Sequence, residues 1–221
     1  MVKSKNGWKS FEKWLQQEVE ETFGIVQQAK SSDLDELITN LPLLSEIEKT
    51  AAKELSSDLM AFVNKWNEED LKMYFISQLI LLAKLKQKTY RAFFDCTLKT
   101  ELRNESIAGR VDCVLGKGSQ FPVNPLFFLQ EYKPKKNPSG DPLGQLLIAM
   151  LATQQLNNDV EKPLFGCYIV GQLWAFVVLK GNDYTVSSDY DATDEQKLST
   201  IIGILKKIKV MYEIKIGLIS A

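Results

Sequence analysis

The sequence predicts an α/β protein in which a mixed sheet packs against helices. Between residues 89 and 187, short apolar runs typical of strands are interrupted by one longer, capped apolar run typical of a helix. Apolar side chains spaced three and four residues apart predict further helices over 8–86 and after residue 193. With 221 residues, 45% of them hydrophobic and 25% charged, the chain is long enough to bury a large core.

Residues 1–66 are expected to form helices packed on the core, and residues 67–221 the core itself. Three helices are predicted: one from residue 8 to about Gly24, a short one capped within Ser31-Ser32-Asp33, and a longer one from Ser45 to about Trp66. Two apolar stripes should face inward: Trp8, Phe11, Trp14, Leu15, Val19, Phe23 and Ile25 on the first helix, and Leu44, Ile47, Ala51, Leu55, Leu59, Phe62, Val63 and Trp66 on the third. No linker rich in Pro, Gly or Ser separates the two regions.

The core begins with a helix capped by Asn67 that runs from Glu68 to about Lys86. Alternating side chains from Thr89 to Leu102 then predict a strand that leads into the sheet. Glu68 has two interpretations. It complements the helix N-terminus, where negative charge is favoured, or it reaches a functional site.

Two further strands carry the residues that suggest chemistry. The strand Ile107–Leu115 places Asp112 among apolar residues, and the strand Pro125–Lys133 is apolar until Glu131 and Lys133, which is typical of a central strand. Since side chains alternate along a strand, Glu131 and Lys133 share one face and Tyr132 takes the other. If the two strands pair, Asp112 and Glu131 become cross-strand neighbours.

Such a pair of carboxylates favours a shared proton or a cation. Two carboxylates about 4 Å apart repel by roughly 4 kcal/mol at an effective dielectric constant near 20. A site built from oxygen ligands suits Mg²⁺ or Mn²⁺, which leave positions for water and phosphate oxygens. Lys133 beside the ion would orient or deprotonate water and offset phosphate charge, so the residues outline a phosphodiester hydrolysis site.

The next element is a helix predicted from Leu143 to about Asn157. Asp141 is a favourable N-cap, Pro142 occupies the first helical position, and Gln145 lies in the first turn, whose N–H groups would attract phosphate. Three strands are then expected over Phe165–Val170, Leu173–Leu179 and Tyr184–Ser187, the first two joined by Gly171-Gln172. Thr193 with Gln196 predicts a capping box that starts a closing helix.

An Asp on one strand, Glu-x-Lys on the next and a following helix with Gln resembles the PD-(D/E)XK nuclease superfamily. The likeness is greater to the N-terminal nuclease domain of type I restriction enzyme motor subunits and to related small stand-alone proteins, over about residues 67–190. It implies a restriction-endonuclease-like fold: a mixed central sheet with an αβββαβ core, extra strands and an N-terminal helical elaboration.

The resemblance also implies roles for individual residues. Asp112, Glu131, the carbonyl of Tyr132 and Glu68 would be metal ligands, Lys133 the catalytic lysine and Gln145 an auxiliary helix residue. The family's Pro before the Asp is Val111 in this chain, at a position that sets backbone shape.

The acid-x-Lys motif alone is not diagnostic, because it occurs four times, at Asp70-Leu71-Lys72, Glu131-Tyr132-Lys133, Glu195-Gln196-Lys197 and Glu213-Ile214-Lys215. Only the second follows an apolar strand, has an Asp on the preceding strand and is followed by a capped helix with Gln. The competing interpretation is that Glu131 and Lys133 are ordinary charges at a strand end.

The amino-acid composition argues against several other classes of function. The chain has no His, which excludes Ser–His and Cys–His catalysis and leaves zinc without its usual ligands. Cys96, Cys113 and Cys167 fall in strand-like runs and are expected to be reduced packing residues. A net charge of −1 argues against electrostatic binding of nucleic acid by the whole surface. Two local basic clusters are phosphate-facing or simply solvated: Lys84, Lys86, Lys88 and Arg91, and Lys133, Lys135 and Lys136.

The expected function is that of a Mg²⁺- or Mn²⁺-dependent nuclease acting on DNA. The alternative is a non-catalytic interaction or nucleic-acid-binding subunit that retains the nuclease fold, and either fits a homodimer or a larger complex. No apolar run approaches the roughly 20 residues of a membrane span and the first residues lack a signal-peptide core. We therefore expect a cytoplasmic protein without a membrane partner.

Overall fold

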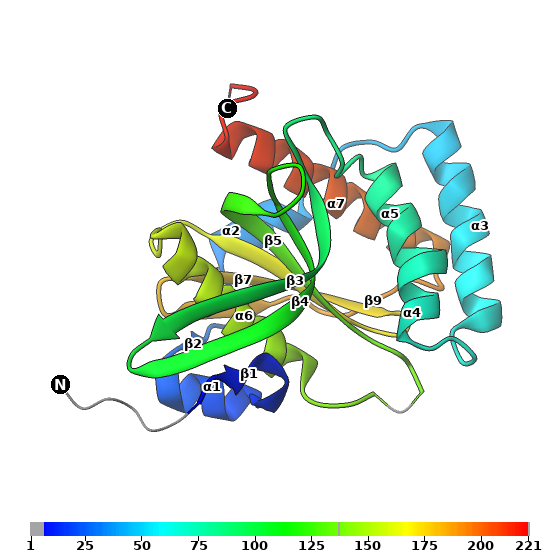
Figure 1. Ribbon diagram of the computed structural model, residues 1–221. Helices are drawn as coiled ribbons and strands as arrows, with labels where there is room; N and C mark the ends of the chain where they lie inside the picture. The colour runs from blue at the N-terminus through cyan, green and yellow to red at the C-terminus, as the bar shows by residue number, and fades with distance from the viewer. Residues whose placement is uncertain (1–6, 137, 221) are drawn as a thin grey trace.

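The computed structural model describes residues 7–136 and 138–220 (Figure 1). The strands are β1 (Lys9–Ser10), β2 (Val26–Gln27), β3 (Tyr90–Leu102), β4 (Glu105–Lys117), β5 (Val123–Lys133), β6 (Leu164–Val170), β7 (Leu173–Lys180), β8 (Asp183–Val186) and β9 (Tyr190–Asp191). The helices are α1 (Gln16–Phe23), α2 (Ser32–Ile38), α3 (Glu46–Phe62), α4 (Glu68–Leu71), α5 (Ser77–Leu82), α6 (Pro142–Asn157) and α7 (Glu195–Lys215), with a 3-10 turn η1 (Phe11–Lys13) and a π-helical turn η2 (Lys72–Ile76).

The strands form one mixed sheet, so the predicted α/β class is confirmed. β3, β4 and β5 are antiparallel neighbours, β5 and β6 are parallel, and β7 returns antiparallel to β6. Parallel neighbours need a crossover connection, and α6 supplies it between β5 and β6. β5 is therefore a central strand, as its apolar sequence predicts.

Helices cover both faces of the sheet (Figure 1). On one face, Leu129 of β5 shares a core with α1 and α6, for example with Met150. On the other face, Phe128 of β5 shares a core with α2, α3, α5 and α7, for example with Leu205. Burial on both faces explains why β5 reads as an almost continuous apolar run.

The N-terminal helices pack directly on the core. Leu37 of α2 and Leu59 of α3 are fully buried in the same cluster as α7, and Glu48 of α3 pairs with Lys206 of α7 at 2.8 Å. The predicted stripe on α3 is wrong at Ile47 and Phe62, which are 80% and 43% exposed. The buried face instead follows Ala52, Ser56, Leu59 and Val63.

The predicted helix from residue 8 to Gly24 is wrong in its first half. Lys9 and Ser10 pair in parallel with Ile107 and Ala108 of β4, and α1 begins only at Gln16. Phe11 packs against Gly109 so closely that a Cβ there would lie 2.2 Å from its ring. This tertiary contact overrides the helical spacing, whereas the predicted end of the helix agrees with Gly24, at φ 60°.

Two other helix boundaries differ from the predictions. The helix expected to run from Glu68 to Lys86 contains the π-helical turn η2 and ends at Leu82. The predicted capping box of Thr193 and Gln196 is absent, because the cap of α7 is Asp194, which accepts a hydrogen bond from the Lys197 N–H at 2.9 Å. In the described part of the chain, no helix is both long enough and apolar enough to cross a membrane.

Candidate active site

The site lies where β4 and β5 separate. The last pair in their ladder is Cys113 with Gln130, and continuing that register places Asp112 opposite Glu131. Beyond this point β4 pairs with β1 instead. The end of β5 is thus open toward β4, and Asp112 and Glu131 lie where the two strands separate. We call this opening between β4 and β5 the fork.

A distortion of β3 and β4 accompanies the fork. The β3–β4 pairs on either side place Asp95 opposite Asp112, and Asp95 has φ 52°, a left-handed conformation that is strained for a residue other than glycine. Val111 and Cys113 would share a face in a regular strand, yet they lie in the cores on opposite faces of the sheet. The alternation of β4 therefore shifts at Asp112, which leaves its side chain at the fork.

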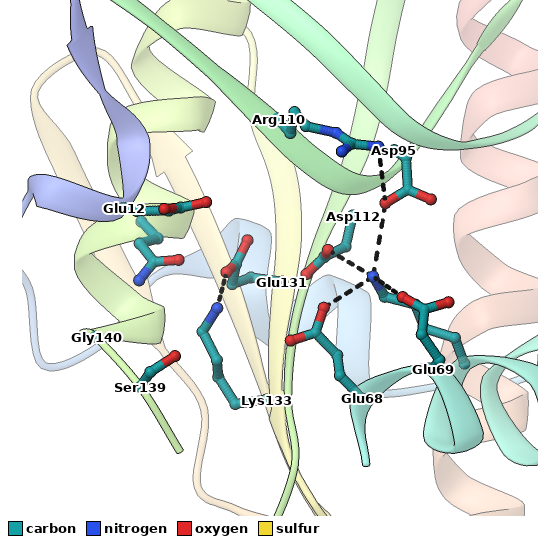
Figure 2. Close-up of a pocket in the computed structure, with 12 residues that line it drawn as sticks. Glu12, Glu68, Glu69, Asp95, Arg110, Asp112, Glu131, Lys133, Ser139 and Gly140 are labelled. Atoms are coloured by element: carbon teal, nitrogen blue, oxygen red, sulfur yellow. Dashed lines mark hydrogen bonds and ion pairs between the residues drawn. The ribbon is translucent and has the colours of Figure 1, made fainter. Parts of the chain in front are cut away.

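A pocket of about 490 Å³ opens at this fork (Figure 2). It is lined by Glu12, Glu68, Glu69, Lys72, Asp95, Arg110, Asp112, Glu131, Lys133, Ser139, Gly140 and Gln145. Five predicted site residues are among them: Asp112, Glu131, Lys133, Gln145 and Glu68. The structure thus brings together side chains from α4, β4, β5 and α6.

Tyr132, the sixth predicted residue, turns its ring into the core on the opposite face. Its backbone N–H points toward β4 and donates to Asp112 Oδ2 at 2.7 Å. The next carbonyl, that of Lys133, points the other way and accepts from the Gly171 N–H at 2.9 Å. Because successive carbonyls of a strand alternate in direction, the Tyr132 carbonyl points toward β4, on the side of Asp112.

Glu131 and Lys133 form a buried ion pair. Lys133 Nζ lies 2.8 Å from Glu131 Oε1, and each side chain is 9% exposed. Burial raises the pKa of Glu131 to about 7, with a further increase from the Asp112 charge and a partial decrease from Lys133. Burial alone would lower the pKa of Lys133, but the charges of Glu131, Glu68 and Asp112 outweigh it, so that pKa is raised and the ammonium is retained.

Asp112 is held by two donors at the fork. Besides the Tyr132 N–H, the ammonium of Lys72 lies 3.0 Å from Asp112 Oδ1. Burial raises the pKa of Asp112, although the Tyr132 N–H and Lys72 both act in the opposite direction. Figure 2 shows Asp112 facing Glu68 across the pocket, and the ion pairs of both carboxylates with Lys72 meet between them.

Gln145 is placed by the loop that precedes α6. It is 3% exposed, and Gly140 has φ 74° and packs so closely that a Cβ there would lie 2.3 Å from Gln145 Nε2. The N-terminus of α6 is capped by Asp141, with Pro142 at its first position, as the sequence predicts. Asp141 accepts from the Gly144 N–H at 3.0 Å and also from the Gln16 N–H at 2.7 Å.

Several lining residues were not predicted from the sequence. Lys72 belongs to the acid-x-Lys motif Asp70-Leu71-Lys72, which does not lie in a strand. The sequence signal that could have placed it beside Glu68 is the spacing of four residues between the two in a helix. Asp95 and Arg110 come from β3 and β4, where their Oδ1 and Nη2 atoms are 3.7 Å apart. Glu12 comes from η1, and no local signal places it at the fork.

The donor chemistry of the pocket fits Mg²⁺ or Mn²⁺. Six acidic and three basic side chains line it, which gives a formal charge of −3 when all are ionised. Carboxylate and carbonyl oxygens are the ligands that these ions prefer. Among the described residues, no three His, Cys, Asp or Glu side chains are already gathered as a ligand set. The cation found between Glu68 and Asp112 is the Lys72 ammonium, 2.9 Å and 3.0 Å from their oxygens.

No protein-family model matches the chain, and no curated protein matches it either. The α/β fold and the residues of the pocket are therefore the observations that bear on function.

Proposed function

We propose that the chain is a divalent-metal-dependent nuclease that hydrolyses DNA phosphodiester bonds. The observation that carries the proposal is the convergence of Asp112, Glu131, Lys133 and Gln145, from three different elements, on one pocket. The order of elements α4–α5, β3, β4, β5, α6 and β6 supports a restriction-endonuclease-like αβββαβ core of PD-(D/E)XK type.

In this proposal the ion is held by Asp112, Glu131, the carbonyl of Tyr132 and Glu68. When bound, Mg²⁺ or Mn²⁺ supplies Lewis-acid polarisation of the phosphodiester and a more acidic water. Lys133 keeps its proton on Nζ and presents a positive charge to the phosphate, where negative charge develops in the transition state. Gln145 orients the reacting groups from the side of α6.

A second candidate is a non-catalytic subunit that retains the same fold. It is favoured by the Lys72 contact, because an ammonium already neutralises Asp112 and Glu68. It is also favoured by the negative pocket, which repels phosphate unless a cation is added. Such a protein would act as a homodimer or as a subunit of a larger complex.

Cleavage assays on plasmid and single-stranded DNA with Mg²⁺ or Mn²⁺ separate the two candidates. We expect Lys133→Met and Asp112→Asn to lower the cleavage rate at least about 100-fold, since each removes charge aimed at the reacting phosphate or its metal. Lys53→Met, which removes an exposed lysine of α3, is the matched control and should cleave normally. Equal cleavage by all variants would assign the activity elsewhere, and no cleavage by the wild type favours the subunit.

A further inference from the structure

Lys72 lies near four carboxylates of the pocket, yet the nuclease mechanism proposed above gives it no role. Lys72 Nζ lies 2.9 Å from Glu68 Oε1 and 3.0 Å from Asp112 Oδ1. It also lies 3.6 Å from Glu69 Oε1 and 3.6 Å from Asp95 Oδ1. Lys72 is itself only 8% exposed. A buried ammonium thus bridges α4 to both distorted strands, and Figure 2 shows these interactions meeting at one point.

The helix is locally modified at this lysine. The π-helical turn η2 starts at Lys72, while Leu71 just before the turn and Phe75 within it remain packed in the core. Insertions of this kind redirect side chains and recur at functional sites. The distortion allows the helix to keep its apolar face on the sheet and still direct a lysine into the acidic pocket.

The two oxygens of Asp112 are held differently. Oδ2 accepts from the backbone N–H of Tyr132, a donor fixed by the position of β5. Oδ1 accepts from Lys72, whose four-carbon side chain can move. A cation that binds Asp112 therefore competes with Lys72 for Oδ1, because two positive charges on one oxygen repel each other.

We propose that Lys72 is an internal counter-ion that holds the position between Glu68 and Asp112 and yields it to a divalent cation. This inference rests on the proposed function, since it concerns the same ion. Lys72 then remains near its two more distant partners, Glu69 and Asp95, which lie away from Glu131. It acts through the carboxylates and is a positioning residue: without metal it offsets the repulsion between Glu68 and Asp112 and holds them in place, and it weakens metal binding.

The test is Mn²⁺ titration calorimetry on the wild type, Lys72→Met and Lys72→Gln. Both variants should bind Mn²⁺ at least about ten-fold more tightly, because the competing charge is gone. Lys72→Arg keeps that charge and should bind like the wild type. The matched control is Arg110→Met, which removes one positive charge from the same pocket near Asp95 without a contact to Asp112.

Thermal unfolding supplies a readout independent of activity. Without metal, Lys72→Met should melt below the wild type, because several carboxylates lose their counter-ion. Saturating Mn²⁺ should then raise its melting temperature by more than it raises that of the wild type. If Lys72→Met does not fold, Lys72→Gln, which retains a hydrogen-bond donor, replaces it in both measurements.

The outcomes separate this inference from the proposed function. Mn²⁺ binding that Glu131→Gln abolishes, but that folded Lys72→Met or Lys72→Gln does not strengthen beyond Arg110→Met, overturns the counter-ion role alone. Weaker Mn²⁺ binding by the folded Lys72 variants also overturns the counter-ion role. It would mean that Lys72 supports metal binding by holding the carboxylates in position. Absence of binding in the wild type and in every folded variant overturns both the counter-ion role and the metal-dependent function.

Discussion

At the scale of single residues, the ionisation of Glu131 changes near neutral pH. Its pKa of about 7 in the fold lies above the ordinary carboxyl value because of burial and the Asp112 charge. The folded protein therefore binds more protons than the unfolded chain between about pH 4.5 and 7. Stability contributed by this carboxyl is complete below that interval and is lost as the pH rises through it.

Glu131→Gln should remove this dependence in metal-free protein. We expect its stability relative to the wild type to increase between pH 5 and pH 8 by on the order of 2 kcal/mol, since each pKa unit corresponds to about 1.4 kcal/mol. Thermal unfolding in the presence of a chelator measures it, with the exposed Glu54→Gln as control. A difference between variant and wild type that does not change with pH would show that Glu131 is already ionised in the fold.

Gly140 places Gln145 at the pocket. Gly140→Ala puts a Cβ 2.3 Å from Gln145 Nε2 at a φ of 74°, so we expect lower DNA cleavage together with a stability loss of about 1 kcal/mol. Gly181→Ala introduces similar backbone strain at φ 58° with nothing within 4 Å. It should lose comparable stability and keep its activity. If both variants cleave equally, the position of Gln145 does not matter for the reaction.

At the scale of elements, one carboxylate caps two helices. Asp141 accepts from the N–H of Gln16, the first residue of α1, and from the N–H of Gly144 in the first turn of α6, whereas Asp194 caps α7 alone. A lost cap costs about 1 kcal/mol, so Asp141→Ala should reduce the free energy of unfolding about twice as much as Asp194→Ala. Chemical denaturation measures both. An equal loss would mean that the contact between Asp141 and Gln16 adds nothing.

Local sequence signals predicted the elements that carry Asp112, Glu131, Lys133 and Gln145. β4, β5 and α6 form within two residues of their expected bounds, because strand alternation, the Asp141 cap and Pro142 act over short distances. The N-terminal segment was mispredicted because its pairing partner, Ile107, is almost 100 residues away. Lys72 was missed for a similar reason: its contacts to Asp95 and Asp112 exist only after β3 and β4 meet α4.

At the scale of the whole molecule, charge is distributed unevenly. The chain carries a net charge of −1 and the pocket a formal −3. DNA should therefore bind poorly until a divalent ion reduces the negative charge at the site. If the proposed function holds, this charge distribution should make DNA affinity, as well as cleavage, dependent on metal.

We expect Lys133→Met, the variant predicted to cleave slowly, to bind a DNA duplex at least about ten-fold more tightly with Mn²⁺ than with a chelator. Fluorescence anisotropy at matched ionic strength measures the two affinities. Adding Glu131→Gln should remove the difference. An affinity that does not respond to Mn²⁺ would place DNA binding away from this pocket.

In the proposed function, Asp112 and Glu131 hold a metal at the fork between β4 and β5. The most direct test of this placement is anomalous diffraction from crystals of this protein soaked in Mn²⁺. We predict a peak at about 2.1 Å from a carboxylate oxygen of each of the two residues. A peak elsewhere, or none in the pocket while Lys72 still contacts Asp112, would show that these two carboxylates do not hold the metal.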